Sequence, residues 1–210
     1  SRVTTAPVSV ADATKPEERR FISALFVDLV GFTPLTEARD SEEVRHMLTV
    51  YFDRAREVVD RFGGVIEKYI GDAVMAVWGA HTAHEDDAER AVRAALELVD
   101  AVHAVGDELN LPDLRARAGV VSGEAVVGGD GNESTGLIVG DTVNTASRIQ
   151  SAAATGQVLV GRSTMDLASK SIEFESIGSL DLKGKDGPVE AFRAVRVFAG
   201  VGGTRRADGL

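Results

Sequence analysis

The chain contains no cysteine among its 210 residues. Disulfide bonds, zinc sites built from thiolates and cysteine nucleophiles are therefore all excluded. Because chains without cysteine suit a reducing compartment, we expect a cytoplasmic protein. The sequence also lacks any run of about 18 or more apolar residues, so we expect neither a membrane span nor contact with a membrane. The segment Ser1–Thr5 is no signal peptide, and because position 1 is not Met we expect a longer parent chain with regulatory domains.

Basic residues are scarce as well, since 23 Lys and Arg stand against 33 Asp and Glu, which gives a formal net charge of −10. Such a charge repels phosphate backbones, so nucleic acid is not an expected partner. Hydrophobic residues make up 44% of the chain, enough for a full core. Both ends mix small and polar residues without periodicity. We therefore expect a linker at 1–19, one folded domain at 20–198 and a flexible tail at 199–210.

The hydrophobic pattern predicts helices and strands that are interleaved along the chain. Apolar residues spaced by three and four predict helices at 41–62, 85–105, 141–153 and 163–168. Runs of β-forming residues predict strands at 21–27, 65–70, 73–78, 114–122, 125–127, 137–139, 158–160, 172–182 and 189–197. Because several neighbouring strands form hairpins, we expect a mixed or antiparallel sheet and not a doubly wound one.

Two carboxylates stand out beside predicted strands. Asp28 directly follows an apolar β-rich run, and Asp72 lies in a predicted hairpin turn. Each alone is an ordinary loop or turn residue. If their strands are neighbours, both carboxylates reach one rim of the sheet, where hard oxygen ligands suit Mg²⁺ bridging a polyphosphate. The segment from Leu29 to Phe32 and Thr33 would then offer backbone N–H groups to phosphate oxygens.

Lys68 is a second unusual residue, because period-two alternation places it on the same strand face as Ile66 and Ile70. Snorkelling to the edge of the sheet is the ordinary explanation for such a lysine. Lys183 and Lys185 lie in a predicted turn, where they are either simple turn charges or ligands of phosphate.

The sharpest local pattern is a polar stripe on the helix expected at 141–153. Asp141, Asn144 and Arg148 are spaced i, i+3 and i+7, so one helix face presents an acid, an amide and a guanidinium together. A solvated helix face is one interpretation. The other is a site for phosphoryl transfer, because Arg beside Asn can stabilise a charged transition state.

Three ordered motifs, Phe26–Thr33, Glu67–Ala76 and Gly140–Arg148, resemble the class III nucleotidyl cyclase homology domain. The resemblance covers about residues 20–197, nearly the whole chain outside its tails. It implies an α+β fold, a ferredoxin-like sandwich with a mixed, mainly antiparallel sheet. It also implies a head-to-tail homodimer with active sites at the interface, in which the segment around Asp130 clasps the partner.

The resemblance further implies roles for individual residues. In that family the positions of Asp28 and Asp72 hold two Mg²⁺ or Mn²⁺ ions, and the carbonyl of Leu29 assists one of them. The positions of Lys68 and Asp141 recognise the adenine edge. Guanylyl members carry Glu and a small residue or Cys there, so these two residues favour ATP as the substrate.

The remaining implied roles concern the ribose, the α-phosphoryl transition state and the triphosphate. Asn144 matches the residue that orients the ribose, Arg148 the one that stabilises the α-phosphoryl transition state, and Lys183 the one that contacts the triphosphate. The expected activity is conversion of ATP to 3′,5′-cyclic AMP and pyrophosphate, with the metal ligands from one protomer and the other groups from its partner.

Two alternatives remain at this point. The segment Gly128–Asp130 resembles the start of the diguanylate cyclase signature, although it continues with Gly131 and Asn132 instead of an acidic residue and Phe. A cyclase-like domain can also serve as a catalytically silent module for dimerisation or nucleotide sensing.

Overall fold

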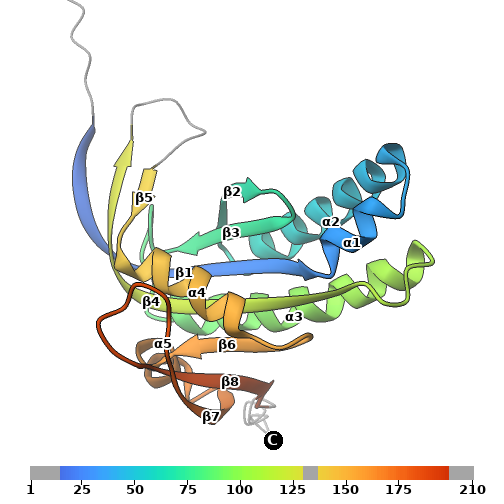
Figure 1. The fold of residues 1–210 in the computed structure, drawn as a ribbon. Coiled ribbons are helices and arrows are strands. Elements are labelled where there is room, and N and C mark those ends of the chain that lie inside the picture. Colours follow the sequence, from blue (N-terminus) through green and yellow to red (C-terminus); the bar gives the residue numbers. More distant parts are fainter. Residues whose placement is uncertain (1–14, 130–136, 199–210) are drawn as a thin grey trace, which may run out of the picture.

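The computed structural model describes residues 15–129 and 137–198, which form one sheet covered by helices on both faces (Figure 1). The strands are β1 Lys15–Val30, β2 Val65–Ile70, β3 Ala73–Trp78, β4 Arg115–Gly129, β5 Leu137–Val139, β6 Val158–Gly161, β7 Ile172–Leu180 and β8 Val189–Val197. Their order is β2-β3-β1-β4-β6-β8-β7, and β5 pairs with β4. Of the described strand pairs, β4 and β6 alone are parallel. The sheet is thus mixed and mainly antiparallel, as expected.

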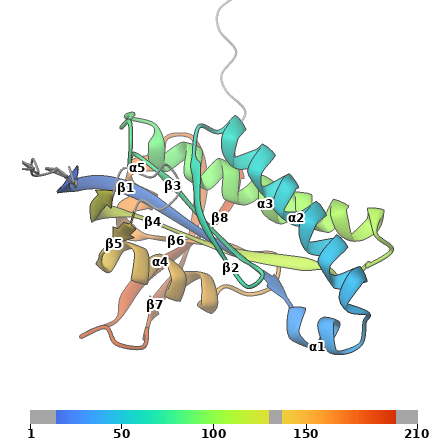
Figure 2. The same ribbon diagram turned by 90° about the horizontal axis from the view of Figure 1, so that it is seen from above.

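Five helices are described. They are α1 Phe32–Glu37, α2 Ser41–Arg61, α3 Asp87–Glu108, α4 Asp141–Ala152 and α5 Arg162–Ala168. Helices α2 and α3 cover one face of the sheet, and α4 crosses the other (Figures 1 and 2). The path β1–α2–β2–β3–α3–β4, with strands in the order β2-β3-β1-β4, is ferredoxin-like. The predicted fold class is confirmed.

Strand β1 is buried on both faces because successive side chains point to opposite sides of the sheet. Leu25 and Val27 pack in the larger core under α2 and α3, whereas Ala24 and Phe26 pack in a smaller core with Ala146 of α4. This explains why the sequence of this strand is continuously apolar and does not alternate.

The predicted helix at 41–62 is confirmed as α2. The side chain of Asp40 accepts a hydrogen bond from the backbone N–H of Glu42 at 2.8 Å, which caps the first turn. No helix in the described part of the chain is both long and apolar enough to cross a membrane.

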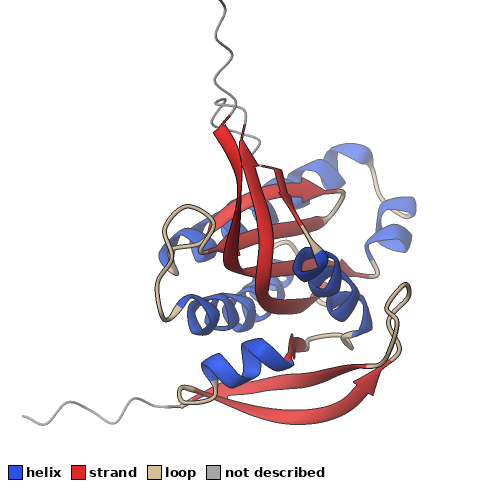
Figure 3. Ribbon diagram, turned by 90° about the vertical axis from the view of Figure 1, so that its left-hand side faces the viewer, coloured by secondary structure: helices blue, strands red, loops and turns tan. Residues whose placement is uncertain are grey.

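Some boundaries differ from the predictions. β1 begins at Lys15, inside the segment 1–19 that we expected to be a linker, because its first residues pair with the end of β4 (Figure 3). The expected strands 114–122 and 125–127 are one strand, β4, since Gly123 and Glu124 continue the ladder with β1. The expected tail 199–210 lies outside the described residues.

The segment around Asp130, expected to clasp a partner, is also outside the described residues. One short helix was not predicted. The stretch after Asp28 was expected to be a loop, but Phe32 begins α1, which follows Gly31 in the left-handed conformation at φ 72°. Only glycine adopts this conformation readily, which explains Gly31 at the junction of strand and helix.

Helix α4 approaches β4 so closely that a side chain at Gly119 would collide with it. A Cβ atom there would lie 2.4 Å from the backbone N of Gln150 and 2.7 Å from the carbonyl O of Ala146. Both contacts are with backbone, so no side-chain rotation relieves them. Gly119 therefore sets the depth at which α4 sits on the sheet.

We predict that Gly119→Ala lowers the free energy of unfolding by about 3 kcal/mol, because α4 must move away from β4. Gly128→Ala in the same strand is the matched control, since a Cβ there meets only the flexible Glu17 side chain at 3.4 Å. Chemical denaturation measures both variants. Equal stability of the two would contradict the close contact.

Candidate functional site

The two predicted carboxylates lie side by side. β1 and β3 are neighbours, with Val27 opposite Val74, so the turn between β2 and β3 stands beside the end of β1. The backbone N–H of Leu29 donates a hydrogen bond to Oδ2 of Asp72 at 3.1 Å. The strand pairing that the spacing left open is therefore formed, and it brings Asp72 to Asp28.

Two donors orient the Asp28 carboxylate. Nη2 of Arg117 and Nε2 of Gln150 both donate to its Oδ2, each at 3.1 Å. Arg117 lies directly opposite Asp28 in the β1–β4 ladder, and Gln150 comes from α4. Both donors act on Oδ2, so neither Arg117 nor Gln150 occupies Oδ1 of Asp28.

The electrostatics of the pair favour a cation. Burial, followed by the hydrogen bond and the charge of Asp28, together raise the pKa of Asp72 from 3.8 to about 6. Burial also raises the pKa of the Tyr51 phenol, with smaller contributions from Asp72 and Asp28. Tyr51 therefore stays neutral behind the carboxylates.

These residues fit a divalent cation. Two carboxylates that repel each other gain from a shared positive charge, and the carbonyl of Leu29 follows Asp28 in the chain. In the described ranges no group of three or more His, Asp or Glu side chains is arranged so that it could hold a metal ion. Mg²⁺ commonly uses one or two protein carboxylates and takes its other ligands from water and substrate phosphates, so two are sufficient.

The prediction for Lys68 was partly wrong. A β-bulge falls between Ile66 and Lys68, so Ile66 pairs with Ala76 whereas Lys68 pairs with Met75. Directly paired residues share a face and successive residues do not, so Lys68 faces the same side as Ile70 but the opposite side from Ile66. Met75 belongs to the core cluster that contains α4 residues. The bulge therefore directs the exposed Lys68 toward the α4 side of the sheet.

The polar stripe of α4 is present. Asp141 and Asn144 are exposed, and Arg148 is partly buried. The connection between β7 and β8 lies across this stripe, since Nη1 of Arg148 donates to the carbonyl of Gly184 at 3.3 Å and Nζ of Lys185 lies 2.5 Å from Oδ2 of Asp141.

Lys183 is exposed in the same connection. Lys185, and not Lys183, makes the ion pair with Asp141. Phe32 and Thr33 open α1 immediately after the carboxylate strand, where backbone N–H groups of a first helical turn lack intrahelical acceptors.

One chain does not bring the carboxylate pair and the stripe into one cavity. At about 100° per residue, Gln150 lies about 180° around α4 from Asp141. Gln150 is 4% exposed and contacts Asp28, whereas the stripe lies on the opposite side of the helix. The carboxylate pair therefore lies on the buried side of α4, and the stripe lies on the opposite, exposed side.

The sequence analysis missed Arg117 and Gln150. Arg117 is recognisable only once the register of β1 against β4 is known. Gln150 carries a weak signal, because a polar residue on the apolar side of a predicted helix needs a partner.

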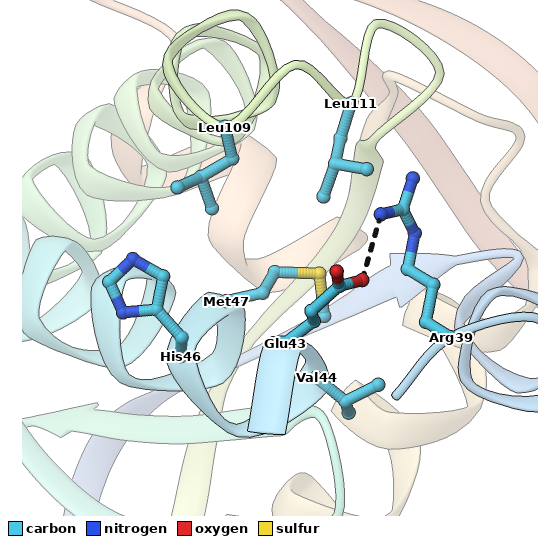
Figure 4. Close-up of a pocket in the computed structure, with 7 residues that line it drawn as sticks. All are labelled: Arg39, Glu43, Val44, His46, Met47, Leu109 and Leu111. Atoms are coloured by element: carbon cyan, nitrogen blue, oxygen red, sulfur yellow. Dashed lines mark hydrogen bonds and ion pairs between the residues drawn. The ribbon is translucent and has the colours of Figure 1, made fainter. Parts of the chain in front are cut away.

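A separate cavity of about 200 Å³ lies between the start of α2 and the connection from α3 to β4 (Figure 4). It is lined by Arg39, Glu43, Val44, His46, Met47, Leu109 and Leu111. None of the predicted site residues is among them, so this cavity belongs to no part of the candidate site.

Residues 14–194 match the family model described as the adenylate and guanylate cyclase catalytic domain. The chain is 34% identical over 199 residues to adenylate cyclase 1 of Rhizobium meliloti, which covers 89% of this chain but 29% of that protein. This chain therefore spans less than a third of that relative.

Solved structures are similar as well. The adenylyl cyclase CyaB from P. aeruginosa has a TM-score of 0.82 at 27% identity and covers 89% of this chain and 100% of its own. The guanylyl cyclase Cya2 has a TM-score of 0.80 at 31% identity and covers 88% and 96%. The similar proteins thus include both an adenylyl and a guanylyl cyclase.

We predict that Asp72→Asn stabilises the metal-free protein at pH 7.5. The pKa of Asp72 is raised from 3.8 to about 6, so its contribution to stability is full below pH 3.8 and is lost as the pH rises through 6. Because solvent screens this partly exposed pair, we expect a gain of about 1 kcal/mol at pH 7.5.

The measurement is thermal unfolding with a chelator present. The variant and the unsubstituted protein should converge as the pH falls from 6 to 3.8. A difference that is the same at both ends of this range would contradict the repulsion between the carboxylates.

Proposed function

Because the chain belongs to the adenylate and guanylate cyclase catalytic domain family, we propose that it converts ATP to 3′,5′-cyclic AMP and pyrophosphate. The 3′-oxygen of the ribose attacks the α-phosphorus in line and forms a new P–O bond. The bond from the α-phosphorus to the bridging oxygen breaks, pyrophosphate leaves, and the hydroxyl proton passes to solvent. The observation that carries the proposal is the facing pair Asp28 and Asp72 beside the first turn of α1.

Asp28 and Asp72 would hold two Mg²⁺ or Mn²⁺ ions, with help from the carbonyl of Leu29. When bound, the ions acidify the 3′-hydroxyl and neutralise charge on the leaving pyrophosphate. The backbone N–H groups of Phe32 and Thr33 would donate to phosphate oxygens next to this pair.

The α4 stripe and its neighbouring loop would handle the rest of the nucleotide. Asn144 would orient the ribose through its amide, and Arg148 would donate to the α-phosphoryl oxygens as charge builds in the transition state. Lys183, exposed in the loop beside the stripe, would bind the triphosphate.

Lys68 and Asp141 support ATP over GTP. Adenine presents an acceptor at N1 and a donor at its 6-amino group, so an ammonium and a carboxylate match it. Guanine presents the reverse pattern, an acceptor at O6 and a donor at N1–H. The bulge that turns Lys68 toward the α4 side of the sheet is consistent with a joint role of these residues.

The carboxylate pair and the stripe lie on opposite sides of α4, which supports sites shared across a head-to-tail homodimer. Each site would take the carboxylate pair from one protomer and the stripe, with Lys68, from its partner. A catalytically silent module that senses nucleotide is the alternative, and it would bind ATP in Mn²⁺ without releasing pyrophosphate.

We predict that Asp72→Ala and Arg148→Ala each lower cyclase activity at least about 100-fold, since the first removes a proposed metal ligand and the second a proposed donor to the α-phosphoryl oxygens. Mixed in equal amounts, they should regain about a quarter of normal activity, because half the dimers are mixed and each has one intact site. Cyclic AMP release measures this. Absence of rescue at a matched dimer level would count against shared sites.

We predict that Lys68→Glu combined with Asp141→Cys shifts the ratio of kcat/KM for ATP to that for GTP by about 100-fold toward GTP. Lys170→Glu, which makes the same charge change as Lys68→Glu on an exposed turn, is the control and should leave the ratio unchanged. An unchanged ratio in the double variant would refute the roles of these residues in base recognition.

A further inference from the structure

Helix α4 has two functional sides. Its exposed side carries the stripe, and its buried side carries Gln150, which is 4% exposed and donates through Nε2 to Oδ2 of Asp28 at 3.1 Å. Burying an amide costs free energy unless it forms hydrogen bonds, and here the bond to the carboxylate offsets that cost. The side chain of Gln150 is thus tied to a candidate metal ligand.

The helix backbone at Gln150 is held in place by contacts with the sheet. The close approach of α4 to β4 at Gly119 fixes the depth of this turn. Arg117 adds a second connection, because its Nη1 donates to the carbonyl of Ser151 at 3.0 Å while its Nη2 donates to Asp28. The last turn of α4 and the Asp28 carboxylate are therefore linked twice.

We propose that Gln150 is a positioning residue that orients the Asp28 carboxylate for metal binding. With Arg117 it occupies Oδ2, so that Oδ1 is the oxygen presented to the cation. Without the amide, Arg117 alone holds the carboxylate, which can then rotate about its Cβ–Cγ bond.

The contact of Gln150 with Asp28 would also link the two sites of the dimer, an inference that rests on the proposed function. The stripe on α4 would serve one active site, whereas Gln150 on the same helix positions the metal ligand of the other. A single rigid helix would then connect the nucleotide groups of one site with the metal ligands of the second.

The first test is Mn²⁺ binding by the Gln150→Met dimer, titrated with the metal alone and followed by electron paramagnetic resonance. Methionine keeps the volume but lacks the donor. Loss of an outer hydrogen bond to a metal ligand should weaken Mn²⁺ binding about 10-fold. Gln157→Met, the matched control at the other glutamine of the chain, should bind Mn²⁺ normally.

Normal Mn²⁺ affinity in a folded Gln150→Met protein would overturn the proposal. If that variant does not fold, Gln150→Asn takes its place, because its shorter amide is polar but falls short of Asp28. The same loss of affinity is expected, and normal affinity would again overturn the proposal.

The second test places Gln150→Met on one chain of the Asp72→Ala and Arg148→Ala mixture. The Arg148→Ala chain supplies the carboxylates of the one intact site, so activity should fall about 10-fold when it carries the change. On the Asp72→Ala chain the loss should stay below about 2-fold. Equal losses on both chains would mean that Gln150 only supports the fold, which overturns the proposal.

The two tests distinguish a failure of the shared active site from a failure of the positioning role of Gln150. If the mixture with Gln150 intact on both chains shows no rescue, the shared site fails, whereas the Mn²⁺ titration still decides the role of Gln150.

Discussion

Asp28 and Asp72 are held close together at the edge where β1 meets the turn between β2 and β3, and much of the structure serves that contact. Burial and the neighbouring carboxylate raise the pKa of Asp72 to about 6, so the pair is unfavourable without a cation. The β1–β3 register, the N–H of Leu29, and the donors Arg117 and Gln150 keep the pair in place. Stabilising contacts elsewhere in the fold offset the unfavourable free energy of this carboxylate pair, which is typical of functional sites.

Helix α4 extends this arrangement to the rest of the molecule. Because Gly119 lets it lie against β4, its buried side reaches Asp28 while its other side displays Asp141, Asn144 and Arg148. In the proposed function this helix contributes to different sites on its opposite sides, and a partner molecule would complete each one. The placement of these side chains within one protomer is consistent with the proposed homodimer.

Much of the fold could be predicted from the sequence, because local periodicity fixes elements such as α2 and the hairpin β2–β3. The continuity of β4 through Gly123 and Glu124 could not, since it depends on pairing with β1. The face of Lys68 was mispredicted because a bulge is a property of two strands and not of one. The stripe on α4 needs only helical spacing, whereas Arg117 and Gln150 are recognised only through long-range contacts with Asp28.

We propose above that two copies of this chain form an ATP-selective cyclase. The most direct test is to incubate the purified protein at several concentrations with ATP and Mn²⁺, with GTP in parallel, and to measure cyclic nucleotide per protomer by chromatography. If two copies form this enzyme, cyclic AMP is the main product and the specific activity rises with protein concentration as dimers form. No product at any concentration, with nucleotide still bound, would contradict it.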